Sequence, residues 1–203
     1  MSLYQNLFNE NEIYVTPSEI IEFMYCQRFA YFMNCLGIKQ NEDKRYKVIK
    51  GRNIHIDKSN QNVNYVRKKI NGVAKYINVY MISKNLGLKG IVDEIYELKD
   101  GSLAPLDYKY AVYEEKDFLT SKIQMGLYSL LIEDIYKYKV NKMFLIYCRS
   151  GNLLKELEFK DKDREAAKKA IDDYKKVIQG YYPKATKYKA RCIDCCYRNI
   201  CIK

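Results

Sequence analysis

Two aspartates and a lysine on neighbouring predicted strands have the residue types and the spacing of a site for a divalent metal ion. The segment "GIVDEIYELKDGSLAPLDYKY" places Asp93 within one strand and Asp107 in a D-x-K triplet on the next. Side chains alternate along a strand, so Asp107 and Lys109 share a face. Pairing of the two strands through the turn at Asp100-Gly101 would bring Asp93 close to Asp107.

This grouping points to the hydrolysis of a phosphodiester. Carboxylate oxygens are the ligands that Mg²⁺ and Mn²⁺ prefer. Such an ion polarises the phosphate and lowers the pKa of its bound water, while a lysine positions the nucleophile or neutralises developing charge. A D-x-K triplet also arises by chance in a lysine-rich chain, where it is a solvated charge pair on an edge strand, and this alternative stays open.

Three further polar residues could join such a site. Gln124 and Tyr128 stand four residues apart on an otherwise apolar predicted helix, so both can reach into a site from the same helix face. The alternative is a core tyrosine with a hydrogen-bonded glutamine. His55 is the only histidine, and taken alone it fits a structural histidine better than a ligand.

A second reactive group lies at the end of the chain, in "RCIDCCYRNIC". Its CxxC pair, Cys192 and Cys195, and the later Cys201 can reach one point and supply three of four metal ligands. Cys196 is excluded because the side chains of adjacent residues diverge. Cys26, on the first predicted helix, is the candidate that completes the set and ties the tail to that helix.

The remaining cysteines and the choice of metal follow from context. Cys35 and Cys148 stand at apolar ends of elements and are expected to be small buried residues. A reducing compartment and an odd count of seven cysteines disfavour disulfides. Zinc usually takes two paired knuckles, whereas one distant cysteine with a terminal trio suits an iron-sulfur cluster better. Zinc, or no metal, remain the alternatives.

Composition limits the class of protein. The chain has 203 residues, 48% of them hydrophobic, which is enough for one domain with a proper core. Its net charge of +11 indicates a polyanionic partner, nucleic acid above all, although a biased coding composition could also enrich lysine. No stretch approaches the roughly 18 apolar residues of a membrane helix, and the first 12 residues lack the features of a signal peptide. We therefore expect a cytoplasmic protein.

Hydrophobic periodicity and turn residues predict the elements that position these groups. Helices are predicted from Pro17 to about Cys35, from Glu42 to Ile56, from Glu114 to Lys137 and from about Asp161 to Gln179. Strands are predicted over Tyr65 to Ile70, Ala74 to Ile82, Leu88 to Leu98, Leu103 to Tyr110, Lys142 to Cys148 and Leu153 to Phe159. This order indicates an α+β or mixed α/β fold.

Taken in order, the motifs resemble one family. A cysteine in the first helix, then "GRNIH", "GIVDEI", "LDYK" and "QMGLY", then CxxC with a third cysteine, are similar to the RecB-like nucleases that carry an iron-sulfur cluster. The small CRISPR-associated exonucleases, the fourth Cas family, are the nearest in pattern. The resemblance runs from about Val15 to Cys201. Gln27 departs from it, because the family often has proline after its first cysteine.

The resemblance implies the fold and the residue roles. It implies a restriction-endonuclease-like PD-(D/E)xK core, with Lys109 as the catalytic lysine and with Gln124 and Tyr128 helping to hold DNA and the geometry of the site. It implies two further ligand sets. The Mn²⁺ or Mg²⁺ ligands would be His55, Asp93, Asp107 and the carbonyl of Tyr108, and the 4Fe-4S ligands would be Cys26, Cys192, Cys195 and Cys201.

The resemblance also implies an activity and a pathway. Family members cut single-stranded DNA, commonly from 5′ to 3′, and trim prespacers for the CRISPR integrase complex. We expect one nuclease domain over 1–203, with a helical part at 15–60, the nuclease core at 61–182 and the cysteine tail at 183–203. Aromatic side chains near the groove, Tyr25, Phe29 and Tyr31, are predicted to stack on bases. A non-catalytic nucleic-acid-binding module and a repair nuclease are the alternatives.

Overall fold

The computed structural model describes residues 13–39, 66–115, 119–193 and 195–202, and it confirms a mixed α/β fold. The helical elements are α1 (Pro17–Tyr25), α2 (Gln27–Ala30), η1 (Tyr31–Cys35), η3 (Lys68–Ile70), α4 (Leu119–Tyr136), α5 (Asp161–Ile178) and η4 (Lys189–Cys192). The strands are β1 (Gly72–Ser83), β2 (Leu88–Leu98), β3 (Leu103–Lys109), β4 (Lys142–Tyr147) and β5 (Leu153–Glu158).

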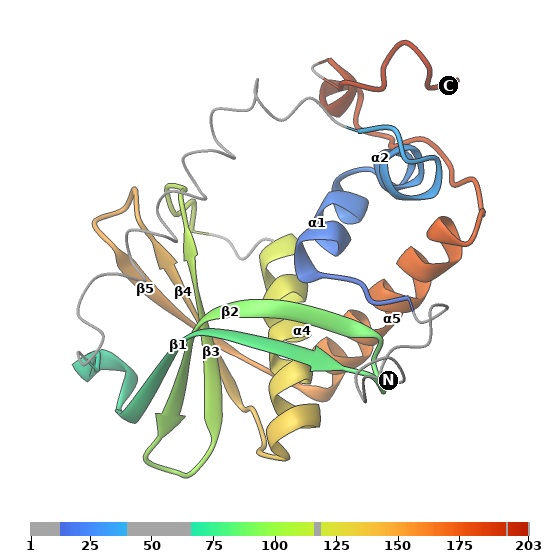
Figure 1. The fold of residues 1–203 in the computed structure, drawn as a ribbon. Coiled ribbons are helices and arrows are strands. Elements are labelled where there is room, and N and C mark those ends of the chain that lie inside the picture. The colour runs from blue at the N-terminus through green and yellow to red at the C-terminus, as the bar shows by residue number, and fades with distance from the viewer. Residues whose placement is uncertain (1–12, 40–65, 116–118, 194, 203) are drawn as a thin grey trace, which may run out of the picture.

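The five strands form one sheet in the order β1-β2-β3-β4-β5, with α4 packed against it (Figure 1). Neighbouring strands are antiparallel except β3 and β4, which are parallel. A parallel pair needs a crossover connection, and α4 supplies it. Helix α5 packs on α4, and α1 packs on both helices.

The β2–β3 hairpin has the predicted turn. Gly101 takes a left-handed φ of 78°, which glycine adopts without strain. Asp100 Oδ1 accepts hydrogen bonds from the amide of Ser102 at 3.0 Å and from its hydroxyl at 2.6 Å. These bonds lower the pKa of Asp100 below its ordinary value of 3.8. Strand β2 has the predicted bounds, and β3 ends one residue early.

One predicted strand is wrong. Within the described part of the segment Tyr65 to Ile70, the chain forms the 3₁₀ turn η3 instead. Asn71 ends that turn with a left-handed φ of 56°, and β1 begins at the next residue. A run of apolar residues this short does not distinguish a strand from a turn that buries a single side chain, here Ile70.

Helix α4 is buried along its middle, in keeping with the apolar character of its sequence. Every residue from Ile123 to Ile132 is buried. A Cβ at Gly126 would lie 3.3 Å from Ala167 Cβ on α5, so glycine allows the two helices to approach closely. The helix is described from Leu119 onward, and Glu114, where it was predicted to begin, is not helical.

The first predicted helix is broken, which corrects the sequence prediction. Thr16 and Glu19 form a capping box at the start of α1, but the helix ends at Tyr25. Cys26 has φ −157° and ψ 116°, an extended conformation, and a short helix and a π-helical turn follow it to Cys35. The hydrophobic pattern did not reveal this break because apolar residues continue on both sides of it.

The chain around this break and the tail form a small separate layer, which we call the cysteine cap (residues 26–38 and 183–202). Its core consists of Phe29, Phe32 and Tyr197, and Cys195 packs against them. In Figure 1 the cap lies at the end of α1 and α5, away from the sheet. Among the described residues, no helix has the length and apolar character needed to cross a membrane.

Candidate active site

The β2–β3 register places Asp93 beside Asp107. Paired residues run from Glu97↔Leu103 to Glu94↔Leu106, and one further step places Asp93 opposite Asp107. The regular pairing stops there, and Asp93 Oδ2 accepts a hydrogen bond from the Tyr108 amide at 3.1 Å. The two carboxylates therefore meet where β2 and β3 begin to separate.

Lys109 lies on the same side as Asp107, as strand alternation predicts. Its Nζ is 2.7 Å from Asp107 Oδ2. The Asp107 side chain is 2% exposed and the Lys109 side chain 21%. Burial of a carboxylate is costly unless a cation or hydrogen bonds compensate it, so this ammonium stabilises the charged form of Asp107.

Helix α4 contributes Gln124 and Tyr128 to the same point. Gln124 Oε1 accepts a hydrogen bond from Lys109, and its Nε2 lies 3.5 Å from Asp107 Oδ1 and 3.4 Å from the Tyr128 hydroxyl. Burial raises the pKa of Tyr128 far above its ordinary value, and the charges of Asp107 and Asp93 raise it further. Tyr128 therefore stays protonated and neutral beside the carboxylates.

A buried polar cluster supports this site from the opposite face of the sheet, and the sequence analysis did not find it. Glu94 is 3% exposed and accepts hydrogen bonds from the hydroxyls of Tyr96 and Tyr108, each at 2.7 Å. Lys75 Nζ lies 3.7 Å from the same carboxylate, and Arg67 donates to the Tyr108 hydroxyl at 3.1 Å. Burial, followed by the hydrogen bond to Glu94, raises the pKa of Tyr96.

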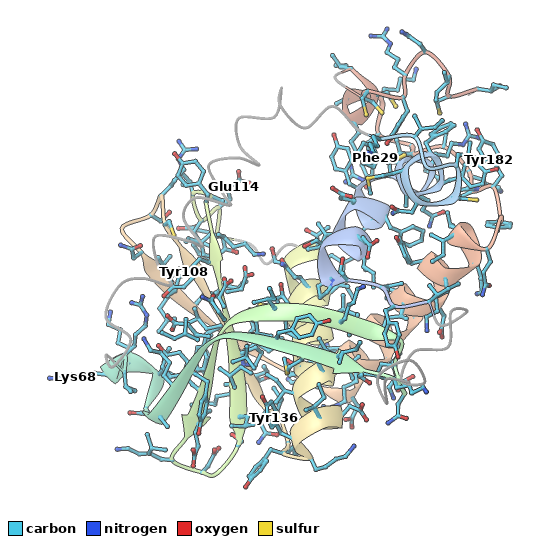
Figure 2. The ribbon with its side chains drawn as sticks, viewed as in Figure 1. Phe29, Lys68, Tyr108, Glu114, Tyr136 and Tyr182 are labelled. Carbon is cyan, nitrogen blue, oxygen red and sulfur yellow. The ribbon has the colours of Figure 1, made fainter. Side chains whose placement is uncertain are left out.

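Tyr108 holds two consecutive residues of β2, one on each face. Its amide donates to Asp93 and its hydroxyl donates to Glu94. Figure 2 shows Tyr108 within the sheet, well away from Phe29 in the cysteine cap and from Tyr182 just before its tail. The sequence contains a signal for the buried cluster: "VDEIY" places an acidic residue on each face of one strand.

Only some of the predicted ligands for a divalent metal ion lie within the described residues. Asp93, Asp107 and the Tyr108 carbonyl supply oxygen atoms, the donor type that suits Mg²⁺ or Mn²⁺. His55 and its predicted helix lie outside the described residues. Between residues 13 and 202, leaving out the undescribed segments, no group of three or more His, Cys, Asp or Glu side chains is arranged to hold a metal ion.

The four predicted cysteine ligands line one cavity. Its volume is about 300 Å³, and its walls include Cys26, Cys192, Cys195 and Cys201. Burial raises the pKa of the Cys195 thiol, and the neighbouring cysteines raise it further. Cys196 is exposed and does not line the cavity. The four thiols thus line a common cavity, although the described structure does not gather them into a group that could hold a metal ion.

Arginine side chains join the tail of the cysteine cap to α1 and α2. Arg28 donates to the carbonyls of Pro183, at 2.9 Å, and of Ile202. Arg191 donates to the Tyr25 carbonyl at 2.6 Å. These bonds join the tail to the first helices across more than 150 residues of sequence.

The predicted aromatic contacts to bases need a correction. Phe29 is 3% exposed because it packs against Tyr197 in the core of the cap, so it is not available to a ligand. Tyr31 is half-buried against the ring of Tyr182, with ring centroids 4.9 Å apart. Tyr25 is 42% exposed and stays accessible.

Comparison of the sequence with known proteins identifies a relative of this chain. A curated relative, "CRISPR-associated exonuclease Cas4" of Francisella tularensis subsp. novicida (strain U112), is 24% identical over 195 residues, which are 95% of each chain. The resemblance inferred from the motifs is thereby confirmed.

Two solved structures share the fold at 16% identity. The crystal structure of SSO0001 matches with a TM-score of 0.59 over 96% of this chain and 87% of its own. A candidate exonuclease from Eubacterium rectale matches with a TM-score of 0.61 over 100% and 95%. These likenesses show that the chain shares its fold with both structures.

A family model settles the wider relationship. The model of the PD-(D/E)XK nuclease superfamily matches residues 57–202, which contain Asp93, Asp107, Lys109 and the cysteine tail. Nucleases of this type use divalent metal ions. The chain therefore belongs to the PD-(D/E)XK nuclease superfamily.

Proposed function

We propose that this protein is a metal-dependent exonuclease that cuts single-stranded DNA, from 5′ to 3′, and trims prespacers for a CRISPR integrase complex in the cytoplasm. The observation that carries the nuclease proposal is the meeting of Asp93, Asp107 and Lys109 at one point, with Gln124 bonded to both Asp107 and Lys109. The relative's exonuclease activity supports the finer proposal.

Asp93, Asp107, the Tyr108 carbonyl and His55 would hold one or two Mn²⁺ or Mg²⁺ ions. When bound, the metal polarises the scissile phosphate and lowers the pKa of a water molecule. Lys109 lies beside the buried carboxylate and can neutralise charge that develops on the phosphate. Gln124 fixes the lysine in that position, and the neutral Tyr128 closes the site with a hydrogen-bonding group that carries no charge.

The test is cleavage of a labelled single strand by the Asp93→Ala variant. We expect cutting in Mn²⁺ or Mg²⁺ by the wild type, none in EDTA and none by the variant, with DNA binding retained. Asp161→Asn is a matched control because that side chain is fully exposed at the start of α5. Undiminished cutting by Asp93→Ala would contradict the assignment of Asp93 to the active site. If the wild type cuts DNA with neither metal, the nuclease proposal fails and the alternative, a non-catalytic nucleic-acid-binding module, is favoured.

Polarity and pathway need separate substrates. Strands blocked at the 5′ or at the 3′ end distinguish the two directions of digestion, and we expect the 5′ block to stop cutting. Prespacers with single-stranded overhangs, incubated with the CRISPR integrase complex, test trimming. Equal rates with and without integrase, or no trimming of overhangs, would contradict the adaptation role and favour a repair nuclease.

For the cysteine cap we propose a 4Fe-4S cluster held by Cys26, Cys192, Cys195 and Cys201, with a structural role. The common cavity of these residues supports this assignment, since four thiolates commonly hold such clusters. Anaerobically purified protein is expected to absorb broadly near ~400 nm and to contain iron and sulfide. A colourless protein with one zinc ion would overturn the cluster but keep the tail as a metal-bound cap.

A further inference from the structure

A groove lies between the start of α1 and the β1–β2 ribbon, and neither the motifs nor the comparisons assign it a role. Its volume is about 430 Å³. Its walls come from the first turn of α1, from both strands and from α4, and they consist of Thr16, Pro17, Ser18, Tyr80, Lys89, Gly90, Ile91 and Tyr128.

The outer end of the groove is an exposed apolar platform. Tyr80 is 61% exposed and Ile91 is 55% exposed. The two residues are directly paired in the β1–β2 register, so their side chains stand next to each other on the same face. A tyrosine ring presented this way on a sheet can stack on an unpaired base, because every base has a π-face.

The inner end of the groove reaches the candidate active site. A Cβ at Gly90 would lie 3.1 Å from Pro17 Cδ, closer than an ordinary contact, so glycine allows Pro17 to approach the strand, and Tyr128 Cε1 lies 3.6 Å from the same position. The Tyr128 hydroxyl lies beside Gln124, which contacts Asp107. The floor of the groove is therefore continuous with the residues around the carboxylates.

The charge of the groove suits a phosphate. Lys89 lines it, and among the described residues its side chain forms no hydrogen bond or ion pair. The lining contains no acidic residue. The N-terminus of α1 is not a phosphate site, because Glu19 accepts the Thr16 amide at 2.7 Å and the Thr16 hydroxyl at 2.8 Å. Lys89 is the cation that a phosphate in the groove would meet.

We propose that this groove is a subsite for one unpaired nucleotide adjoining the scissile phosphate. Its base stacks on Tyr80 against Ile91, and a neighbouring phosphate binds Lys89. This inference rests on the proposed function, because it takes the bound DNA strand to be the substrate of the nuclease. Stacking tolerates any base, so the subsite selects unpaired over paired nucleotides and not a particular sequence.

Binding in EDTA tests the subsite independently of cutting. A fluorescent single strand is scanned with one abasic position at a time, and we expect one position at which the missing base weakens binding to the wild type by about tenfold. Tyr80→Ala weakens binding of the intact strand by a similar factor and removes the sensitivity at that position. Tyr80→Phe retains both, whereas Tyr80→Leu, which is apolar but cannot stack, behaves as Tyr80→Ala.

A matched control lies on the same strand. Tyr76 is 52% exposed on β1 but does not line the groove, so Tyr76→Ala should bind and respond to the abasic scan as the wild type does. Equal losses in Tyr76→Ala and Tyr80→Ala, or additive effects of Tyr80→Ala and the abasic position, would overturn the subsite. If binding follows the proposal but no metal supports cutting, the proposed nuclease function fails and the subsite stands.

The phosphate contact has its own readout. Removal of one phosphate-binding lysine reduces the dependence of log K on log salt by about 0.7 for a single strand. Lys89→Gln should show this smaller slope, whereas Lys168→Gln, at an exposed position on α5, should not. An unchanged slope in Lys89→Gln would overturn the phosphate part of the proposal.

Discussion

The candidate active site and the cysteine cap are held together by different means. The carboxylates of Asp93 and Asp107 are positioned by main-chain pairing in the middle of a five-stranded sheet, with Glu94 and Tyr108 bonded behind them. The cap has a core of three buried aromatic side chains, and a few arginine-to-carbonyl bonds join its tail to α1 and α2. The site residues on the sheet are thus fixed by the fold, whereas the cap has little core of its own beside the four cysteines that line its cavity.

The largest effect should come from the charge beside Asp107. Lys109→Met removes the ammonium 2.7 Å from that carboxylate and leaves the hydrophobic stem. We expect the cutting rate to fall at least about 100-fold, the size typical of a lost electrostatic contact in a transition state. Single-turnover cleavage in Mn²⁺ measures the rate. If the active site and the cysteine cap are held together independently, the visible spectrum and the metal content of the cap do not change in this variant.

The next effect should be confined to the cap. Cys26→Ala removes one of the four thiols around the cavity, and Cys196→Ala, which alters an exposed cysteine outside it, is the control. Cys26→Ala should lose metal and expose residues 183–202 to proteolysis, because metal binding and folding are coupled in small metal-bound units. The sheet should keep its amide protection. Equal loss of protection in β2, β3 and the tail would show that the two regions fold as one.

A smaller effect is expected behind the active site. Tyr108→Phe removes the hydroxyl that donates to the buried Glu94 and accepts from Arg67. A buried partner left without its hydrogen bond costs about 1–3 kcal/mol of the free energy of unfolding. Denaturant unfolding measures this loss. Tyr136→Phe, at an exposed position on α4, should change stability by less than about 0.5 kcal/mol.

The kinetics of Tyr108→Phe show whether the buried cluster around Glu94 affects catalysis or only stability. If the Glu94 cluster positions β2 against β3, the variant should bind Mn²⁺ more weakly and turn over more slowly while the KM for DNA stays constant. A loss of stability with unchanged metal affinity would limit the cluster to a structural role. The absorption of the cap should be the same as in the wild type.

The smallest effect concerns the hairpin that joins the two strands of the site. The bonds from Ser102 lower the pKa of Asp100, so their stabilisation is fully present above the ordinary pKa of 3.8 and is lost as pH falls through the lower folded-state value. Ser102→Ala should remove this dependence and cost less than about 1 kcal/mol near neutral pH, since Asp100 is exposed. Unfolding curves at pH 3 and pH 7 measure both effects. A larger loss at pH 3 than at pH 7 would contradict the assignment.

The sequence by itself determined which residues could do chemistry and most of the elements that carry them. Period-2 alternation predicted that Asp107 and Lys109 share a face, and the turn residues Asp100 and Gly101 predicted the hairpin that brings Asp93 to them. Both signals are local, and local geometry constrains them strongly. CxxC spacing predicted that Cys192 and Cys195 lie close together in the tail, and both line the cavity that Cys26 and Cys201 also line.

Only the tertiary structure decided the features that depend on contacts between distant segments. The break at Cys26 brings the first helices against a tail more than 150 residues away, and no local pattern encodes it. The burial of Phe29 depends on Tyr197, and the role of Glu94 depends on tyrosines from β2 and β3 meeting behind the site. The groove beside Tyr80 exists because Gly90 lets α1 approach the sheet. Packing between separate elements stabilises that approach. Sequence patterns describe each element by itself, so they do not predict such packing.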